Sequence, residues 1–234
     1  MLKIWCIATV HIYNISTVRI YNIATMRIYN CWQQAKKKMN IEILKSKIQL
    51  ENDKVLLLPF ENPRNQELKE IIFEKEIWEF MGMNMKNEKE FEKYLTNTIE
   101  DKKNRICYPF LIIDKKSNRV VGSTRYGYLN IASQKCEIGW TWYGTEFQGT
   151  GLNKACKHEL LKFGFEKIGF RRIQFSADQE NLRSQRAIEK LGAKKEGIFK
   201  NNYIAPNGES RNDVYFSIIK EDWELLKSEK FSEF

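Results

Sequence analysis

Three strand-like segments follow one another with no helix between them, and this order constrains the fold more than any other feature. Residues 110–114, 120–131 and 135–143 are rich in aliphatic and aromatic side chains, and the polar turn 115–119 separates the first two. A doubly wound sheet places a helix after each strand, so this order excludes it. We therefore expect a mixed α+β domain with a mostly antiparallel sheet.

The remaining segments place helices around this sheet. The predicted helices span 65–80, 88–102, 152–167, 182–191 and 221–230, and the further predicted strands span 55–60, 172–177, 195–204 and 214–219. The last two strands form a hairpin around Pro206-Asn207-Gly208-Glu209, and Gly192 is the expected C-cap of a helix. Together these segments predict one α/β (mixed α+β) domain, with a twisted central sheet of about seven strands flanked by helices.

Residues 1–38 differ from the rest of the chain because they contain a short repeat. Ala8–Ile15, Ser16–Ile23 and Ala24–Cys31 match one another at a period of eight residues. This unit is too short for a solenoid repeat, and its apolar residues are too often interrupted for a signal peptide. We expect residues 1–38 to be a low-complexity, disordered leader and residues 39–234 to form the domain.

The net charge of +9 is concentrated at the start of the chain. Residues 1–38 contain six basic and no acidic residues, which leaves 33 basic against 30 acidic residues, a net +3, in residues 39–234. So small an excess gives the domain no strong positive field for nucleic acid. We expect no specific nucleic-acid partner, and a binder that uses residues 1–38 as a basic arm is the weaker alternative.

The cysteines and histidines do not form a recognisable metal site. The five cysteines are scattered without a CxxC pair, and the only histidines are His11 and His158. A zinc site would need a closer cluster of ligands. No segment is long and apolar enough to span a bilayer. We therefore expect reduced thiols in a cytoplasmic protein, with no bound metal and no membrane association.

A glycine-rich turn, 148–153 (QGTGLN), lies between the strand 135–143 and the helix that follows it. A helix start leaves N–H groups unpaired and carries a partial positive charge, and glycines let the backbone approach a ligand closely. This combination predicts a site for a diphosphate. A P-loop would need Lys-Ser/Thr where Leu152-Asn153 stand, and a dinucleotide fingerprint would need glycine instead of Lys154, so ATP and NAD are excluded.

The turn and a later segment together resemble the GNAT superfamily of acetyltransferases. Gln148 and Gly151 match the first and fourth positions of its Q/R-x-x-G-x-G/A motif, and Asn153 stands in place of the final small residue. Residues 181–193 (NLRSQRAIEKLGA) resemble the N-x-x-S-x-x-A-x-x-x-x-G segment that follows the fifth strand of these enzymes.

The end of the chain narrows this resemblance to one branch of the superfamily. Glu196-Gly197 and residues 211–218 (RNDVYFSI) resemble the closing hairpin of the ribosomal-protein N-acetyltransferase (RimJ/RimL-like) branch. The similar segments occur in the same order and spacing over roughly residues 52–225. The resemblance implies a single GNAT-like domain and an N-acetyltransferase that uses acetyl-CoA as co-substrate, without a metal.

The resemblance also implies which residues hold acetyl-CoA. The strand 135–143 is expected to present backbone groups to the pantetheine arm, as a missing neighbouring strand would. The amides of the glycine-rich turn are expected to hold the diphosphate. The implied coenzyme-binding residues are Ile138, Gly139, Trp140, Gln148, Gly149, Thr150, Gly151, Leu152, Asn153, Asn181 and Ser184. Asn181 is also placed to cap the helix that follows it, and the two roles are compatible.

Three residues are candidates for the proton transfers of the reaction. Ser184 resembles the serine near the coenzyme sulfur, so it is the expected general acid, and a solvent-facing helix serine is its alternative role. Tyr203 stands where RimL-like members have a glutamate base, but a neutral tyrosine is a poor base near pH 7. Glu137 is the other candidate base, unless it forms a cross-strand salt bridge. A base that acts through a water molecule is the third possibility.

The sequence leaves the amine acceptor open. Protein N-termini, lysine side chains, polyamines, amino sugars and aminoglycosides are all compatible with a GNAT scaffold. The acceptor is expected to contact the first two helices, the Tyr126/Tyr128 strand and the hairpin 201–211. A catalytically silent module that binds or senses acyl-CoA is the alternative function. The chain is expected to be a monomer or a homodimer.

Overall fold

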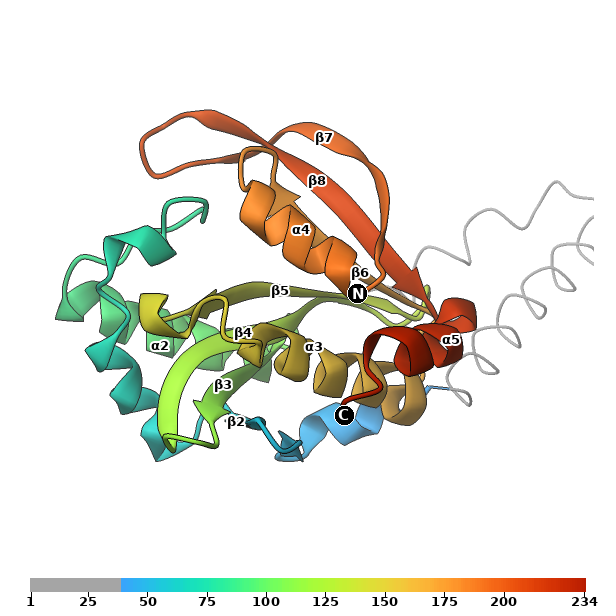
Figure 1. Cartoon of the computed structure of the whole chain (residues 1–234). Helices are drawn as coiled ribbons and strands as arrows, with labels where there is room; N and C mark the ends of the chain where they lie inside the picture. The colour runs from blue at the N-terminus through green and yellow to red at the C-terminus, as the bar shows by residue number, and fades with distance from the viewer. Residues whose placement is uncertain (1–38) are drawn as a thin grey trace, which may run out of the picture. The chain divides into compact units, whose positions relative to one another are not determined.

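The computed structural model describes residues 39–234, so the predicted leader, residues 1–38, lies outside the described residues. The strands of the described part form one sheet in the order β1-β2-β3-β4-β5-β6-β8-β7 (Figure 1). They are β1 (Leu50–Glu51), β2 (Val55–Pro59), β3 (Tyr108–Asp114), β4 (Arg119–Asn130), β5 (Lys135–Tyr143), β6 (Arg172–Asp178), β7 (Lys194–Ile204) and β8 (Ser210–Ile219). All neighbouring pairs in this sheet are antiparallel except β5 and β6, which are parallel.

The mixed, mostly antiparallel sheet confirms the predicted fold class. The sheet has eight strands instead of about seven because a two-residue strand, β1, pairs with β2 at its edge. The helices of the described part are α2 (Glu88–Lys103), α3 (Leu152–Lys162), α4 (Leu182–Lys190) and α5 (Lys220–Lys230). None of them is long and apolar enough to cross a membrane.

The predicted long helix over 65–80 is wrong. This segment forms two short 3-10 helices, η2 (Pro63–Glu70) and η3 (Lys75–Ile77), separated by a turn. Glu74 has an extended backbone (ψ 117°) that ends any helix at this point. The indole of Trp78, just after η3, donates to the carbonyl of Ile72, in the turn before η3, at 2.7 Å. The apolar residues are buried as the helical spacing predicted, but by a folded-back loop.

The predicted helix over 152–167 is also divided. The α-helical part, α3, ends at Lys162, and residues Phe163–Ile168 (η5) continue it as a π-helix. Gly169, with φ 89°, then stops the helical stretch in a left-handed conformation that glycine adopts readily. The helical stretch is continuous over the predicted range, as the apolar spacing indicated, and only the type of helix changes at Phe163.

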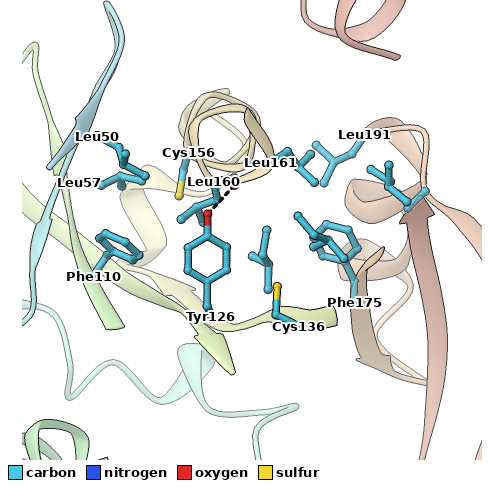
Figure 2. Close-up of a cluster of buried hydrophobic side chains, with 14 of the residues drawn as sticks. Leu50, Leu57, Phe110, Tyr126, Cys136, Cys156, Leu160, Leu161, Phe175 and Leu191 are labelled. Carbon is cyan, nitrogen blue, oxygen red and sulfur yellow. Dashed lines mark hydrogen bonds between the residues drawn. The ribbon is translucent and has the colours of Figure 1, made fainter. Parts of the chain in front are cut away.

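Two clusters of buried apolar side chains pack against the sheet, one on each face. On one face, α3, α4 and α5 enclose a core of 32 buried residues, part of which Figure 2 shows. Tyr126 stands within this core with its ring fully buried, and its hydroxyl donates to the carbonyl of Leu160 at 2.5 Å. On the other face, η2, η3 and α2 pack over a second core that includes Leu111, Ile113 and Trp142.

The parallel strands β5 and β6 pair over only three residues before they diverge. The pairs are Lys135↔Arg172, Cys136↔Ile173 and Glu137↔Gln174. Beyond them, β5 contains a bulge, because Gly139 pairs with Arg125 and Trp142 with Ser123, so three steps along β5 match two along β4. Trp140, at this bulge, has φ 49°. A bulge bends its strand, so the backbone itself opens the sheet between β5 and β6.

Gly122 allows the close approach of β4 and β5, and an alanine there should destabilise the fold. An added Cβ would lie 2.0 Å from the carbonyl oxygen of Trp142, which is a backbone atom that cannot rotate away. We expect Gly122→Ala to lower the free energy of unfolding by about 2–3 kcal/mol, as overpacking of a buried site does. Chemical denaturation measures this change. Gly197→Ala in β7, where a Cβ would meet no atom within 4 Å, should leave the midpoint near that of the wild type.

Candidate active site

A cleft of about 570 Å³ lies where β5 and β6 diverge. Its walls are the bulged half of β5, the end of β6, the glycine-rich turn with the start of α3, and α4. Glu76 and Ile77 of η3, and Phe80 and Met81 of the loop that follows it, line one side. Because β6 no longer pairs with this half of β5, the β5 edge that faces the cleft is free to hydrogen-bond a ligand.

The glycine-rich turn gives the cleft a helix start with open backbone groups. Gly149 and Gly151 have φ values of 77° and 90°, and no atom lies within 4 Å of a Cβ built at either position. Gly151 is the N-cap of α3, so no side chain caps this helix. Its first N–H groups therefore remain available for an anion. The residues present fit the diphosphate of a coenzyme.

Basic side chains surround this helix start. Lys154, Arg183, Arg186 and Lys190 all line the cleft. Arg183 donates to the side-chain oxygen of Gln148, and the amide nitrogen of Gln148 donates to the carbonyl of Tyr143 at 3.2 Å. Gln148 thus links α4 to the end of β5 across the mouth of the cleft. Among residues 39–234, no cluster of acidic, cysteine or histidine side chains could hold a metal ion.

Most of the residues that the sequence assigned to the coenzyme line this cleft. The lining residues among them are Ile138, Gly139, Trp140, Gln148, Gly149, Gly151, Asn153, Asn181 and Ser184. Two others do not line it. Leu152 is buried in the core beneath the turn, and the hydroxyl of Thr150 donates to the carbonyl of Phe147 at 2.7 Å. Neither side chain is part of the cleft lining, so backbone groups are what these two residues offer a ligand there.

Asn181 and Ser184 lie together at the start of α4. The side-chain oxygen of Asn181 accepts from the backbone N–H of Ser184 at 3.0 Å, which is the N-cap that the sequence predicted for Asn181. The hydroxyl of Ser184 makes no hydrogen bond with any residue that the structure describes. It is half-buried on the cleft wall and free to donate to a bound molecule.

Glu137 is buried beside the cleft and has no cationic partner among residues 39–234. Its carboxylate accepts from the side chains of Gln174 and Ser176, both at 2.9 Å, so the cross-strand salt bridge is absent and two neutral donors take its place. Burial raises the pKa of Glu137, and these two hydrogen bonds oppose the rise. Ser176 and Gly139 line the cleft. A Cβ at Gly139 would lie 3.2 Å from the Glu137 carboxylate, so the missing side chain leaves this carboxylate approachable.

Tyr203 is directed at a carboxylate and is therefore unsuited to be a base. Its hydroxyl donates to Asp178 at 2.7 Å, and burial together with this hydrogen bond raises the pKa of Tyr203 above its ordinary value. Asp178, by contrast, lines the cleft at the end of β6. Tyr203 thus reaches the cleft only through Asp178.

Several cleft residues were not found from the sequence, and Asp178 and Lys157 are two of them. Asp178 is the last residue of β6 and also accepts from the backbone N–H of Glu180 at 2.7 Å. Lys157 projects from α3 into the cleft wall and is 5% exposed. A lysine on the apolar face of a predicted helix was the signal that could have identified Lys157, because lysine is rarely buried without a role.

The residues expected to contact the acceptor are divided between core and surface. Tyr126 is fully buried, so it cannot contact an acceptor, whereas Tyr128 is 62% exposed. Trp78, in the first predicted helix, belongs to the core that packs under α2. Phe80 and Met81 line the cleft.

Comparison with known proteins identifies the family. Residues 54–194 match the model of the acetyltransferase (GNAT) domain. The chain is 27% identical to "Uncharacterized N-acetyltransferase YnaD" of Bacillus subtilis (strain 168) over 114 residues, which are 49% of this chain and 65% of that protein. It is 31% identical to "Putative ribosomal N-acetyltransferase YdaF" of the same organism over 96 residues, 41% of this chain and 51% of that protein. The chain thus matches about half to two thirds of the length of these curated relatives.

The fold is shared with solved structures as well. A GCN5-related N-acetyltransferase from Brucella melitensis superimposes with a TM-score of 0.73 at 23% identity, over 80% of this chain and 85% of that one. The sheet of this chain diverges at β5 and β6, and its glycine-rich turn starts α3 at the same opening. The chain belongs to the GNAT family of acetyltransferases.

Proposed function

We propose that the protein transfers an acetyl group from acetyl-CoA to a primary amine. The observation that carries this proposal is the opening between β5 and β6, which joins a free strand edge to the uncapped start of α3. An extended amide-containing arm fits the strand edge, and a diphosphate fits the helix start. The matching family model supports the same coenzyme.

Different residues of the cleft would bind the diphosphate and the pantetheine arm of acetyl-CoA. The backbone N–H groups of Gly149, Gly151 and the first turn of α3 would hold the diphosphate, with Arg183 and Lys154 supplying positive charge. The exposed backbone of Ile138, Gly139 and Trp140 would hold the pantetheine arm. Acetyl-CoA supplies an activated thioester when bound, and the protein has to place it beside the amine.

We assign the proton transfers to Ser184, which lines the cleft, and to Glu137, which is buried behind Gly139 and Ser176. Glu137, whose pKa is raised by burial, would accept the proton of the attacking amine through Ser176 or across Gly139. Ser184 would donate a proton to the sulfur as the C–S bond breaks. The amine attacks the thioester carbonyl directly. The described cysteines, Cys107, Cys136 and Cys156, are buried free thiols, so an acyl-cysteine step has no accessible nucleophile among them.

Removing the hydroxyl of Ser184 should slow the reaction without weakening coenzyme binding. We expect Ser184→Ala to lower kcat by about tenfold or more, because general acid catalysis contributes at least this much, and to leave the KM for acetyl-CoA nearly unchanged. Ser184→Thr keeps a hydroxyl and should recover much of the rate. Steady-state kinetics with a fixed amine measures both values. An unchanged kcat in Ser184→Ala would assign the acid to a water molecule.

The proposed function is tested by incubating the full chain with acetyl-CoA and representative amines. The release of free thiol and the mass of each acceptor are followed over time. The panel includes protein N-termini, lysine peptides, polyamines, amino sugars and aminoglycosides. The name of YdaF gives ribosomal proteins the first place among the protein acceptors. Binding of acetyl-CoA with no transfer to any class would support the silent acyl-CoA-binding module instead.

A further inference from the structure

Lys157 is a buried lysine whose only hydrogen-bond partners in the described part of the chain are hydroxyl groups. Its ammonium donates to Oγ1 of Thr141 on β5 at 2.5 Å and to Oγ1 of Thr124 on β4 at 3.3 Å. It forms no ion pair with any carboxylate of residues 39–234. Burial lowers the pKa of Lys157 to about 8. Burying a charge without an opposite charge beside it costs folding free energy, so we expect Lys157 to have a function that offsets this cost.

The two threonines connect Lys157 to the bulge that opens the cleft. Their hydroxyl oxygens lie 2.8 Å apart, and the hydroxyl of Thr141 donates to the carbonyl of Gly139 at 3.3 Å. Thr141 and Gly139 are the residues on either side of Trp140 in the bulge of β5. Lys157 therefore contacts, through one hydroxyl, the peptide group that forms the cleft wall.

The ammonium group determines the direction of its own two hydrogen bonds in this network. A lysine ammonium can only donate, so both threonine oxygens must accept from Lys157. Because the hydroxyl of Thr141 donates to the carbonyl of Gly139, the hydroxyl of Thr124 is the donor in its bond with Thr141. In a planar trans peptide the N–H of Trp140 points opposite to this carbonyl. The network thus fixes the orientation of the Gly139–Trp140 peptide.

We propose that Lys157 is a positioning residue that acts through Thr141 and Thr124 to fix the Gly139–Trp140 peptide against acetyl-CoA. This inference rests on the proposed function, because it assigns that peptide to the coenzyme. A bulge residue with positive φ, such as Trp140, is unfavourable for a large side chain, so it persists only where its surroundings hold it. The network from Lys157 supplies that restraint from the core side.

Three substitutions test the network, and two of them preserve the shape of the side chain. Thr141→Val removes the hydroxyl with nearly the same volume, and Thr141→Ser keeps the hydroxyl and is the matched control. Lys157→Met removes the ammonium. Hydrogen–deuterium exchange of peptides that cover residues 137–143 reports the bulge directly and needs no coenzyme. We expect faster exchange in Thr141→Val and Lys157→Met, and exchange near that of the wild type in Thr141→Ser.

Kinetics then separates positioning from stability. Thr141→Val and Lys157→Met should raise the KM for acetyl-CoA by about tenfold, the change expected when a hydrogen bond to a charged group is lost, and should leave the KM for the amine unchanged. The double variant should show no further increase, because both changes break one network. A merely stabilising role would shift the melting temperature without a selective change in the KM for acetyl-CoA.

Each outcome decides the proposal. Wild-type exchange and kinetics in Thr141→Val, or equal defects in Thr141→Val and Thr141→Ser, would overturn it. If Lys157→Met does not fold, Thr141→Val and Thr124→Val test the network without it. Both should show faster exchange of residues 137–143 and a higher KM for acetyl-CoA. If the wild type transfers acetyl to no amine, the proposed function fails. Calorimetric titration of acetyl-CoA into the same variants then tests the network through binding alone.

Discussion

Replacing Glu137 with glutamine is expected to lower kcat for acetyl transfer by at least about 100-fold, the low end of what a positioned general base contributes. Glutamine keeps the shape of the side chain and can still bond Gln174 and Ser176, but it cannot accept the proton of the amine. The KM for acetyl-CoA should change little, because the carboxylate lies behind Gly139 and Ser176. Steady-state kinetics with one amine measures both kcat and the KM for acetyl-CoA.

The pH dependence of the wild type gives a second test of Glu137. The base must be ionised to act, and burial raises its pKa above the ordinary carboxylate value. Activity should therefore fall as the pH drops through this raised pKa, and Glu137→Gln should lack that acidic limb. Glu196→Gln is the matched control, because Glu196 on β7 pairs with Arg172 on β6, across the intervening strand β8, and neither residue lines the cleft. Wild-type kinetics in Glu137→Gln would leave the water-mediated base as the explanation.

Replacing Gly151 with valine is expected to weaken acetyl-CoA binding by about 100-fold or more. Gly151 has φ 90°, a conformation that a β-branched residue adopts only under strain. The helix start would have to change, and its N–H groups would no longer converge on one anion. Calorimetric titration of acetyl-CoA measures the loss, which corresponds to about 2.7 kcal/mol of binding free energy.

Gly208→Val separates this effect from strain alone. Gly208 has φ 88°, and a Cβ there would also meet no atom within 4 Å, but it lies in the turn between β7 and β8 and does not line the cleft. The two variants should lose similar stability, and only Gly151→Val should lose the coenzyme. Equal binding by both would contradict the assignment of the diphosphate to this turn.

The sequence predicted the elements whose signals are local. The strand 172–177 and the helix 182–191 were identified because alternation, a capping asparagine and a terminal glycine act within a few residues. The helix over 65–80 was wrong because its apolar spacing also suits a folded loop, and the bond from Trp78 to Ile72 depends on three-dimensional packing. Edge strand β1, at two residues, carries too little pattern to be recognised.

In the candidate site, too, residues in short local motifs were predictable, whereas contacts between distant segments were not. Gly149, Gly151, Asn181 and Ser184 belong to short motifs, so their positions in the cleft could be anticipated. The hydrogen-bond partners of Lys157 could not be anticipated, because they lie 16 and 33 residues away on two strands. The bulge at Trp140 depends on how β4 and β5 register, which no segment specifies alone.

The short pairing of β5 and β6 also has a mechanical consequence. Only three residue pairs join the half of the sheet that ends in β5 to the half that begins with β6 (Figure 1). A small rotation about this seam would change the width of the cleft while every other strand pair stays intact. Three residue pairs resist such a rotation less than the longer ladders on either side of the seam do, so the strands that border the cleft are also the ones whose separation the sheet restrains least.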